Sequence, residues 1–556
     1  RTLSLSVIGL VVLALAVFFY TPLVKKMGVP RLIIGMFFVL LCLLALLGFV
    51  AYGVSIYFYV YAQRYLGAAR TSAYYAVAPF IGTLLSLFIF RELPRYTYFV
   101  ALSLMIVGGY PWKIPIIENM VQVNIHPSLL PIGRGPWPMP VSILRGIDSG
   151  VTLHKLTEKI DEGDIILQEI IPADPRDNLV TLTEKIGSVA VSLLDEFLSN
   201  TDDLWKNAKP QTEGEYWSEP EDSERTFELT ERVETIEKIL RAFYGYGALT
   251  KIYGVPVKII EGEVSDHPSA EYLSIKIGEK YLICKRWDYA LSPIRLSDRD
   301  TLERIRGKHE PLLSDYTFSL LYCWQKTLGL GVYIEDDLFV VRTENEFFFP
   351  VGEEKKVIAF IRGLLKLEEN VKFRFCDENM KRLVALHFGE DASFRLAEGD
   401  CDYLLCNRAM KDIVGKNLSK RRNQYRAFLK KHDDIKVEYI DQNNIDRVNL
   451  LSQNDLGEYI EAERIGIQEY FALGLFGIII SSSGEDIGFS ICSQKDADTM
   501  QGHFMKNLCR DRGATFYLMK TCIDYFSDKY TFTNMEDDMG IEGLRSFKMS
   551  LDSEII

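Results

Sequence analysis

The chain has 556 residues, of which 48% are hydrophobic and 25% are charged, and its formal net charge is −13. At about 150 residues per domain, this length allows three or four domains and excludes a single small module. The charge is uneven, because residues 1–110 contain one acid, Glu92, and eight bases, so the other 446 residues carry a net charge of −20. The averages therefore combine an apolar, basic part with an acidic part.

The nine cysteines show no CxxC pair and no paired cysteine–histidine spacing. This pattern favours reduced thiols in a cytosolic compartment and predicts neither a zinc site nor a disulfide framework, so no metal is expected. The chain opens at Arg1 and has no signal-peptide pattern. We expect it to be a fragment of a longer polypeptide.

Four uncharged stretches occupy the first part of the chain, at residues 3–24, 32–62, 71–90 and 96–110. A helix needs roughly 20 apolar residues to cross a bilayer, and the second stretch is long enough for one tilted span or two short ones. With two spans, the basic loops fall on one side, as the positive-inside rule requires. We therefore predict about five transmembrane helices, with the soluble domains on the cytoplasmic side of a membrane.

Within residues 48–109, the segment QRYLGAARTSAYYAVAPF is followed, after the next apolar run, by Glu92. This region resembles the closing helices of EamA-type drug and metabolite transporters. That family uses two copies of a five-helix repeat, whereas this chain has room for one copy at most. A membrane anchor is therefore the alternative to a transport pathway, and residues 1–45 stay unassigned.

The segment that follows this part has the highest concentration of candidate catalytic residues in the sequence. A short strand is predicted at residues 121–125, and the proline-bounded loop after it presents Asn124 and His126, while an Asp-Glu-Gly turn brings Asp161. The ends of strands are where α/β sheets place chemistry. An amide, an imidazole and a carboxylate can together stabilise an oxyanion and relay protons during acyl transfer to an amine. The alternative is a structural histidine beside a proline and an ordinary turn.

Four blocks in this region, NIHPSLLP, RGPWP, SGVTLH and IDEGDIILQ, have the order and spacing found in folate-dependent formyltransferases. Residues 109–290 resemble that family, whose members transfer the formyl group of 10-formyltetrahydrofolate to an amine. The resemblance implies that Asn124, His126 and Asp161 are the catalytic residues. It also implies that His154, Gly163 and Asp164 lie at the cofactor site.

The resemblance is incomplete, because the open α/β sheet that precedes the motif in the family has no counterpart here. Either another chain completes the half domain, or the stretch is catalytically inactive, or the sequence joins unrelated pieces. Apolar residues at helical spacing between positions 179 and 197 predict a helix that covers the sheet. Residues 201–228 are predicted as an acidic linker, and residues 254–288 as short strands with a hairpin turn at Gly278-Glu279.

Residues 111–290 hold 19 bases and 30 acids. This excess of acids argues against a polyanion such as tRNA as the acceptor and favours a small amine, for example an amino sugar.

The C-terminal part contains the segments DYTFSLLYCW, CDYLLCNRAMKDIVGKNLSKRRNQYRAF, HFMKN and TNMEDDMGIEGLRSFKMSL. Residues 292–556 thereby resemble the C-terminal domain of phosphatidylglycerol lysyltransferases, a tandem of acetyltransferase-like folds that moves an aminoacyl group from tRNA to a lipid headgroup. The resemblance implies a cleft of nine polar residues: Arg421, Arg422, Asn423, Lys506, Asn534, Glu536, Asp538, Arg545 and Lys548. The basic run at residues 416–431 suits the binding of a phosphate or of an acceptor carboxylate. The alternative is that it forms a solvated helix face without a ligand. The acidic net charge favours a small acyl or aminoacyl donor over tRNA.

The predicted architecture is multidomain. All-α membrane helices occupy residues 1–108, an α/β formyltransferase-like half domain residues 109–200, a linker with a small β-rich extension residues 201–290, and an α+β acetyltransferase-like domain residues 291–556.

The predicted function is a membrane-anchored transferase that moves a formyl group from 10-formyltetrahydrofolate to an amine, with a second acyl- or aminoacyltransferase-like module. One alternative is an acyl or aminoacyl transferase that acts through the C-terminal domain, the formyltransferase part being inactive. Another is a transporter remnant or a composite of fragments. The expected partners are a membrane, a small amine acceptor and a chain that completes the half domain, and nucleic acid is not expected.

Overall fold

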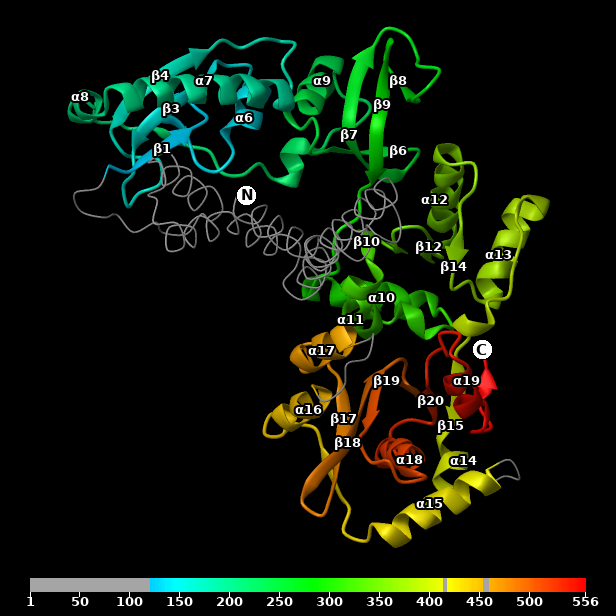
Figure 1. The fold of residues 1–556 in the computed structure, drawn as a ribbon. Helices are drawn as coiled ribbons and strands as arrows, with labels where there is room; N and C mark the ends of the chain where they lie inside the picture. Colours follow the sequence, from blue (N-terminus) through cyan, green and yellow to red (C-terminus); the bar gives the residue numbers. More distant parts are fainter. Residues whose placement is uncertain (1–120, 414–417, 454–459) are drawn as a thin grey trace, which may run out of the picture. The chain divides into compact units, whose positions relative to one another are not determined.

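The computed structural model describes residues 121–413, 418–453 and 460–556 (Figure 1). The predicted membrane helices and the EamA-type region lie outside these described residues. Among the helices within them, none is long and apolar enough to cross a bilayer. For the part of the chain that the structure describes, the predicted all-α membrane fold and multi-pass membrane location are therefore wrong. Even the 21-residue helix α7 (Leu179–Ser199) has one buried, apolar face and an exposed face that includes charged residues such as Glu184 and Asp195, so it packs on a sheet.

The first sheet consists of three antiparallel strands in the order β1–β3–β4. The strands are β1 (Val123–His126), β3 (Ser149–Lys155) and β4 (Ile165–Ile171). The predicted strand at residues 121–125 is confirmed with a small shift. The register places Asn124 opposite His154 and His126 opposite Thr152. Polar side chains from two neighbouring strands therefore meet on this sheet.

Helix α7 covers this sheet and contacts both β3 and β4 (Figure 1). Asn178 begins the helix, since its side chain accepts hydrogen bonds from the backbone N–H groups of Val180 and Thr181 in a capping box. The predicted apolar face is confirmed by the buried side chains Leu179, Leu182, Ile186, Leu193 and Phe197.

The predicted linker at residues 201–228 contains regular elements of its own: α8 (Thr201–Lys206), β5 (Glu215–Tyr216) and a 3-10 turn (Asp222–Arg225). Strand β5 pairs in parallel with β2 (Ile132–Arg134), which precedes helix α6 (Pro138–Arg145). The backbone N–H of Trp217 donates to Arg134 O at 2.7 Å, and the Trp217 ring is buried. The region is thus ordered by strand pairing between β2 and β5, which are distant in sequence. Sequence periodicity does not reveal such pairing.

The extension is a four-stranded antiparallel sheet in the order β6–β7–β9–β8, packed against helix α9 (Val233–Ala242). The strands are β6 (Ala248–Ile252), β7 (Val255–Ser265), β8 (Leu273–Ile277) and β9 (Lys280–Tyr289). The hairpin turn predicted at Gly278-Glu279 is confirmed, because these two residues join β8 to β9. Ile236 and Val257 share one hydrophobic core with Val151 and Leu182, so extension and half domain are packed together.

The described C-terminal residues form two sheets. A five-stranded sheet contains β10 (Gly331–Glu335), β11 (Leu338–Arg342), β12 (Phe347–Phe348), β13 (Val351–Gly352) and β14 (Phe373–Arg374). A seven-stranded sheet has, in spatial order, β16 (Lys436–Tyr439), β17 (Phe476–Ser482), β18 (Glu485–Gln494), β19 (Thr499–Asn507), β20 (Phe532–Asn534), β15 (Tyr403–Cys406) and β21 (Glu554–Ile555).

Ten helices accompany these sheets in the described part of the chain. They are α10 (Arg299–His309), α11 (Phe318–Leu328), α12 (Glu354–Leu367), α13 (Glu378–Phe388), α14 (Asn407–Asp412), α15 (Ser419–Lys431), α16 (Ile445–Ser452), α17 (Ile460–Gln468), α18 (Ala514–Phe526) and α19 (Glu542–Met549). Helix α18 packs on β18 and β19, and α15 packs on α18.

The buried face of α7 provides a test of this packing. Leu193 is 4% exposed and Val191 is 61% exposed on the same helix. We expect Leu193→Ala to lower the free energy of unfolding by about 2–5 kcal/mol, because it leaves a cavity in the core. The neighbouring change Val191→Ala should alter it by less than about 0.5 kcal/mol. Urea unfolding followed by circular dichroism measures both, and equal effects would contradict the assigned helix face.

Candidate functional site

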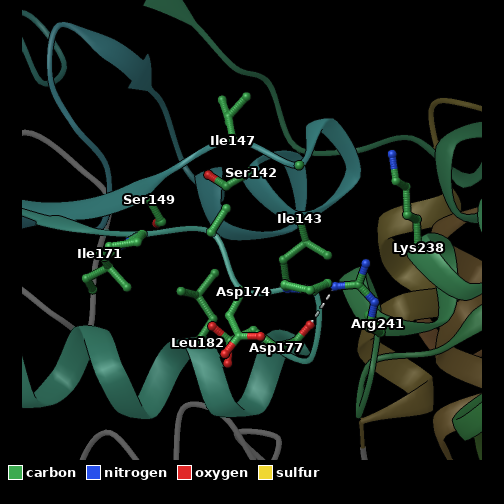
Figure 2. Close-up of a pocket in the computed structure, with 14 residues that line it drawn as sticks. Ser142, Ile143, Ile147, Ser149, Ile171, Asp174, Asp177, Leu182, Lys238 and Arg241 are labelled. Carbon is green, nitrogen blue, oxygen red and sulfur yellow. Dashed lines mark hydrogen bonds between the residues drawn. The ribbon is translucent and has the colours of Figure 1, made fainter.

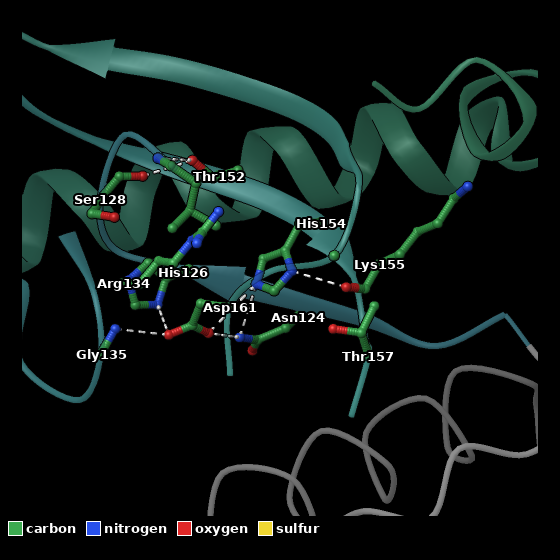
Figure 3. A network of polar contacts seen from close by, with 12 residues as sticks. Asn124, His126, Ser128, Arg134, Gly135, Thr152, His154, Lys155, Thr157 and Asp161 are labelled. Atoms are coloured by element: carbon green, nitrogen blue, oxygen red, sulfur yellow. Dashed lines mark hydrogen bonds and ion pairs between the residues drawn. The ribbon is translucent and has the colours of Figure 1, made fainter. Parts of the chain in front are cut away.

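The carboxylate of Asp161 is the centre of a polar network at one end of the first sheet (Figure 3). Its Oδ2 accepts a hydrogen bond from the backbone N–H of Gly135 at 2.9 Å, and its Oδ1 accepts one from Asn124 Nδ2 at 3.3 Å. His126 Nδ1 lies 3.5 Å from Oδ2, and His154 Nε2 lies 3.7 Å from Oδ1. The structure therefore brings together the three predicted catalytic residues and His154.

The hydrogen bonds of His126 decide which of its ring nitrogens can titrate. Its Nε2 lies 2.7 Å from Gly133 O, and a carbonyl oxygen only accepts, so Nε2 carries a proton and donates it. Nδ1 is then the atom that gains or loses a proton, and it faces Asp161. Burial lowers the pKa of His126 below its usual value, although the charge of Asp161 opposes this. The imidazole is therefore neutral at pH 7, with an Nδ1 lone pair ready to accept a proton.

His154 and Asn124 face each other across strands β3 and β1. His154 Nδ1 donates to Lys155 O at 2.9 Å, so in the neutral ring Nε2 accepts from Asn124 Nδ2 at 3.2 Å. Burial acts to raise the pKa of Asp161, but contacts with His154, with His126 and with the backbone N–H of Gly135 outweigh it, and the pKa falls below its usual value. Asp161 is thus an ionised carboxylate that accepts hydrogen bonds from the backbone N–H of Gly135 and from Asn124.

The turn that carries Asp161 is held in an uncommon conformation. Asp161 has a φ of 54°, in the left-handed region that residues other than glycine rarely occupy. Gln211 Nε2 donates to the carbonyl oxygens of Asp161 and Gly163 at 2.8 and 2.7 Å. A Cβ on Gly163 would lie 1.7 Å from Lys155 O, so only glycine allows this close approach to β3. Surrounding contacts therefore stabilise the strained turn.

Gly163 and Asp164 were predicted to contact the cofactor, and both take part in this turn. Asp164 Oδ2 pairs with Lys155 Nζ at 3.0 Å, and the Asp164 carbonyl accepts from the backbone N–H of Lys155 at 2.9 Å. Arg134, which sequence reasoning did not select, donates from Nη2 to Gln211 Oε1 at 2.9 Å and so supports the same turn. Its position within RGPWP was the available signal.

A cavity of about 230 Å³ lies near the other ends of β3 and β4, where Ser149 and Ile171 line it (Figure 2). Ser149 Oγ and Arg241 Nε are buried there without a hydrogen-bond partner among the described residues. None of the four residues around Asp161 lines this cavity. The polar network around Asp161 and this cavity are therefore separate features of the domain.

The predicted cleft residues of the C-terminal part divide into two groups. Those between β20 and α19 lie together: Asp538 pairs with Arg545 Nε at 2.8 Å, and Lys548 Nζ donates to the carbonyl oxygen of Glu536 at 3.2 Å. Asn534, next to them, donates to Asp402 at 2.7 Å.

The remaining predicted cleft residues have other partners. Arg421 Nε donates to Ser550 Oγ at 3.0 Å, Arg422 Nη1 donates to Ile413 O at 2.5 Å, and Asn423 is exposed. Lys506 Nζ pairs with Glu463 Oε1 at 3.3 Å. Arg422 and Lys506 therefore hold other elements of the fold and do not share one contact cluster with Asp538.

Sequence reasoning missed a buried relay beside Glu536. His503 Nδ1 lies 2.7 Å from Glu536 Oε1, and His503 Nε2 lies 2.7 Å from Ser493 Oγ and 3.0 Å from Ser319 Oγ. The side chain of His503 is only 2% exposed. The segment HFMKN contained the signal, but the partners of its histidine are distant in sequence.

Comparisons with known proteins support two parts of the predicted mosaic. A family model described as formyl transferase matches residues 111–198, and one described as phosphatidylglycerol lysyltransferase, C-terminal, matches residues 308–554. Each match covers less than half of the chain. The predicted acetyltransferase-like fold of the second region stays a prediction.

A methionyl-tRNA formyltransferase of Coprothermobacter proteolyticus is 39% identical over 150 residues, which cover 27% of this chain and 49% of that protein. Two further relatives with the same name come from Ehrlichia canis and Anaplasma marginale. The matches cover 35% and 60% of the length of those proteins. The chain thus spans about half the length of the curated relatives that it matches.

Among solved structures, a conserved protein of unknown function from Bacteroides thetaiotaomicron is 24% identical, with a TM-score of 0.42, and the match covers 48% of this chain and 95% of that chain. HypX from Aquifex aeolicus in complex with tetrahydrofolic acid is 21% identical, with a TM-score of 0.28, and the match covers 33% of this chain and 35% of that chain.

The turn at Gly163 gives a second test. We expect Gly163→Ala to lower the free energy of unfolding by about 1–3 kcal/mol, because the added Cβ forces the turn away from Lys155 O. The matched control is Gly187→Ala in α7, where a Cβ meets nothing within 4 Å. That change should raise stability by up to about 1 kcal/mol through helix propensity. Urea unfolding compares the two, and a neutral Gly163→Ala would show that the close approach is not required.

The titration of His126 gives a third test. Because its folded-state pKa lies below the usual value of 6.5, the unfolded chain binds more protons just below pH 6.5, and stability rises with pH through this window. The depressed pKa of Asp161 adds stability above its usual value of 3.8, which is lost as the pH falls through the folded-state pKa.

We expect His126→Gln to flatten the rise in the free energy of unfolding below pH 6.5, measured by urea unfolding at a series of pH values. His267, an exposed histidine of the extension, supplies the control His267→Gln. Parallel curves for wild type and His126→Gln would contradict the assigned neutral imidazole.

Proposed function

We propose that the region containing β1, β3 and β4 transfers a formyl group from 10-formyltetrahydrofolate to an amine. The observation that carries this proposal is the network of Asn124, His126, His154 and Asp161, which lies within the segment matched by the formyl transferase model. The names of the curated relatives support formyl transfer as the reaction type.

The chemistry of the side chains fits a formyl donor. When bound, 10-formyltetrahydrofolate supplies an activated one-carbon acyl group. For oxyanion stabilisation, donor binding is proposed to turn one of the two Asn124 amide protons, which here go to Asp161 and His154, toward the formyl oxygen, where negative charge develops. His126 is proposed to contribute through the proton that it gains at Nδ1. His154, Gly163 and Asp164 are the residues proposed to hold the donor, since they border the same network. No metal ligand is needed for this set of roles.

Proton transfer is proposed to depend on the pairing of His126 with Asp161. The neutral ring can take a proton at Nδ1, and the carboxylate that faces this atom stabilises the imidazolium that results. Asp161 also fixes Asn124 through its Oδ1. The backbone N–H of Gly135 and the buried position of His126 keep this arrangement ordered and shielded from water.

A small amine is the proposed acceptor. The net negative charge of residues 111–290 disfavours binding of a polyanion such as tRNA. The curated relatives are nevertheless named methionyl-tRNA formyltransferase. A second chain is proposed to complete the half domain. Strand β1 is consistent with this, because it lies at one edge of the three-stranded sheet in the described part of the chain.

A second candidate function rests on the C-terminal part, which we propose to transfer an acyl or aminoacyl group. Its support is the family match over residues 308–554 and the polar cluster of Asn534, Glu536, Asp538, Arg545 and Lys548. Such an activity would not depend on His126.

Formyl transfer is tested with the purified chain, 10-formyltetrahydrofolate and two acceptors, a nucleotide-linked amino sugar and methionyl-tRNA. We expect formylated amino sugar, detected by mass spectrometry, and a loss of at least about 100-fold in rate for His126→Ala, the usual contribution of a general acid–base residue. His267→Ala is the control and should keep full activity. Formylation of tRNA alone would overturn the acceptor class. Unchanged transfer by His126→Ala would overturn the mechanism.

A further inference from the structure

Three side chains of metal-ligand type meet in the C-terminal part, away from the polar cluster of Asp538 and Arg545. His432 follows helix α15, and Cys509 and Asp511 lie in the loop between β19 and α18. One ligand atom from each residue lies within 4.8 Å of the others. His432 Nε2 is 2.7 Å from Asp511 Oδ2 and 3.9 Å from Cys509 Sγ. All three groups are partly accessible to solvent.

The neighbours of His432 determine which nitrogen faces this cluster with a lone pair. Ser482 Oγ donates its single proton to Asp434 Oδ1 at 2.8 Å. The backbone N–H of Ser483 donates to the other oxygen of this carboxylate, Oδ2, so both oxygens of Asp434 act as acceptors. His432 Nδ1, 3.2 Å from Ser482 Oγ, must therefore donate to it. In the neutral ring, Nε2 then points its lone pair at Cys509 and Asp511.

This arrangement places three electron-pair donors face to face. At the 2.7 Å that separates His432 Nε2 from Asp511 Oδ2, an imidazole lone pair facing a carboxylate oxygen is unfavourable unless both share a cation, which can be a proton or a metal ion. A ligating histidine whose other nitrogen donates to an outer partner is the usual arrangement at metal sites. Ser482 and Asp434 supply this outer support here.

The ligand groups are held in place by contacts that do not involve one another. The ring of Phe428, itself 1% exposed, stacks on His432 with the ring centroids 4.5 Å apart. Asn507 fixes the backbone of Cys509, accepting from its N–H at 3.1 Å and donating to its carbonyl oxygen at 3.0 Å. The carbonyl oxygen of Asp511 accepts from the N–H of Ala514 at the start of α18, at 3.1 Å. Binding of an ion would therefore require little further ordering of these three side chains.

We propose that His432, Cys509 and Asp511 bind a divalent transition metal ion, with zinc as the preferred ion. A nitrogen, a sulfur and a carboxylate oxygen suit zinc, with bonds of about 2.0–2.3 Å, and do not suit magnesium or calcium, which take oxygen ligands. Lys431 pairs with Asp511 through the other carboxylate oxygen, Oδ1, which leaves Oδ2 for the metal. Three protein ligands leave a fourth position for water. The ion would join the end of α15 to the start of α18.

The test uses the full chain without a histidine tag, titrated with Co²⁺, whose absorption reports its ligands. We expect one equivalent to bind with a thiolate-to-cobalt charge-transfer band, and Zn²⁺ to displace it. Cys509→Ser should abolish the band, and Asp511→Asn should weaken binding at least about tenfold. The matched control is Cys406→Ser, which removes an exposed free cysteine elsewhere and should leave the titration unchanged.

Thermal unfolding supplies a second measurement. Zn²⁺ should raise the Tm of the wild type and of Cys406→Ser, because a ligand that binds only the folded state stabilises it, and should leave Asp511→Asn with a smaller rise. The proposal is overturned if the wild type shows no charge-transfer band, or if the band persists in Cys509→Ser. If Cys509→Ser does not fold, by circular dichroism, the Asp511→Asn titration decides alone.

Discussion

An ionised carboxylate that accepts hydrogen bonds from two inward-facing donors is the constraint on which the first site depends. Asp161 is reached by a backbone N–H, a side-chain amide and two imidazoles, and it lies on a turn of left-handed conformation. A buried charge is tolerated only when it is paired and hydrogen-bonded. The same contacts that stabilise the charge also orient His126 and Asn124, so stability and site geometry have one physical origin.

The scaffold that holds this carboxylate is a small sheet with a buried central strand. Strand β3 is covered by α7 and shares its core with the extension, which fixes His154 and Lys155 at its end. Gly163 then lets the turn approach β3, and Gln211 and Arg134 hold it there. Packing between distant segments therefore positions a site whose own residues lie on loops and strand ends.

The C-terminal part has a polar core of its own. Asp402 is fully buried and accepts hydrogen bonds from Ser314 and Asn534, which compensate for its burial. Nearby, burial and the charge of Glu536 raise the pKa of Asp537 to about 7. The two parts of the described chain thus treat carboxylates differently: hydrogen-bond donors lower the pKa of Asp161, whereas burial, together with the neighbouring acids, raises the pKa of Asp537.

Local patterns in the sequence were enough to predict several features of this protein. The apolar spacing of Leu182, Ile186 and Leu193 indicated the helix, Gly278-Glu279 the hairpin, and the blocks around Asn124, His126 and Asp161 a formyltransferase-type region. These features depend on residues close in sequence, so periodicity and motif spacing report them. The predicted membrane fold was wrong for the described residues, because no helix among them is long and apolar enough to cross a bilayer.

Only the tertiary structure decided which groups meet and in what state of protonation. Gly133 O sets the tautomer of His126, Gln211 supports the Asp161 turn, and Cys509 meets His432 across 77 positions of sequence. Sequence patterns gave no reason to expect the proposed metal site, because His432 lies 77 positions before Cys509 along the chain. Hydrogen-bond partners, burial and pKa depend on neighbours that the folded chain brings together, and short-range pattern carries no record of them.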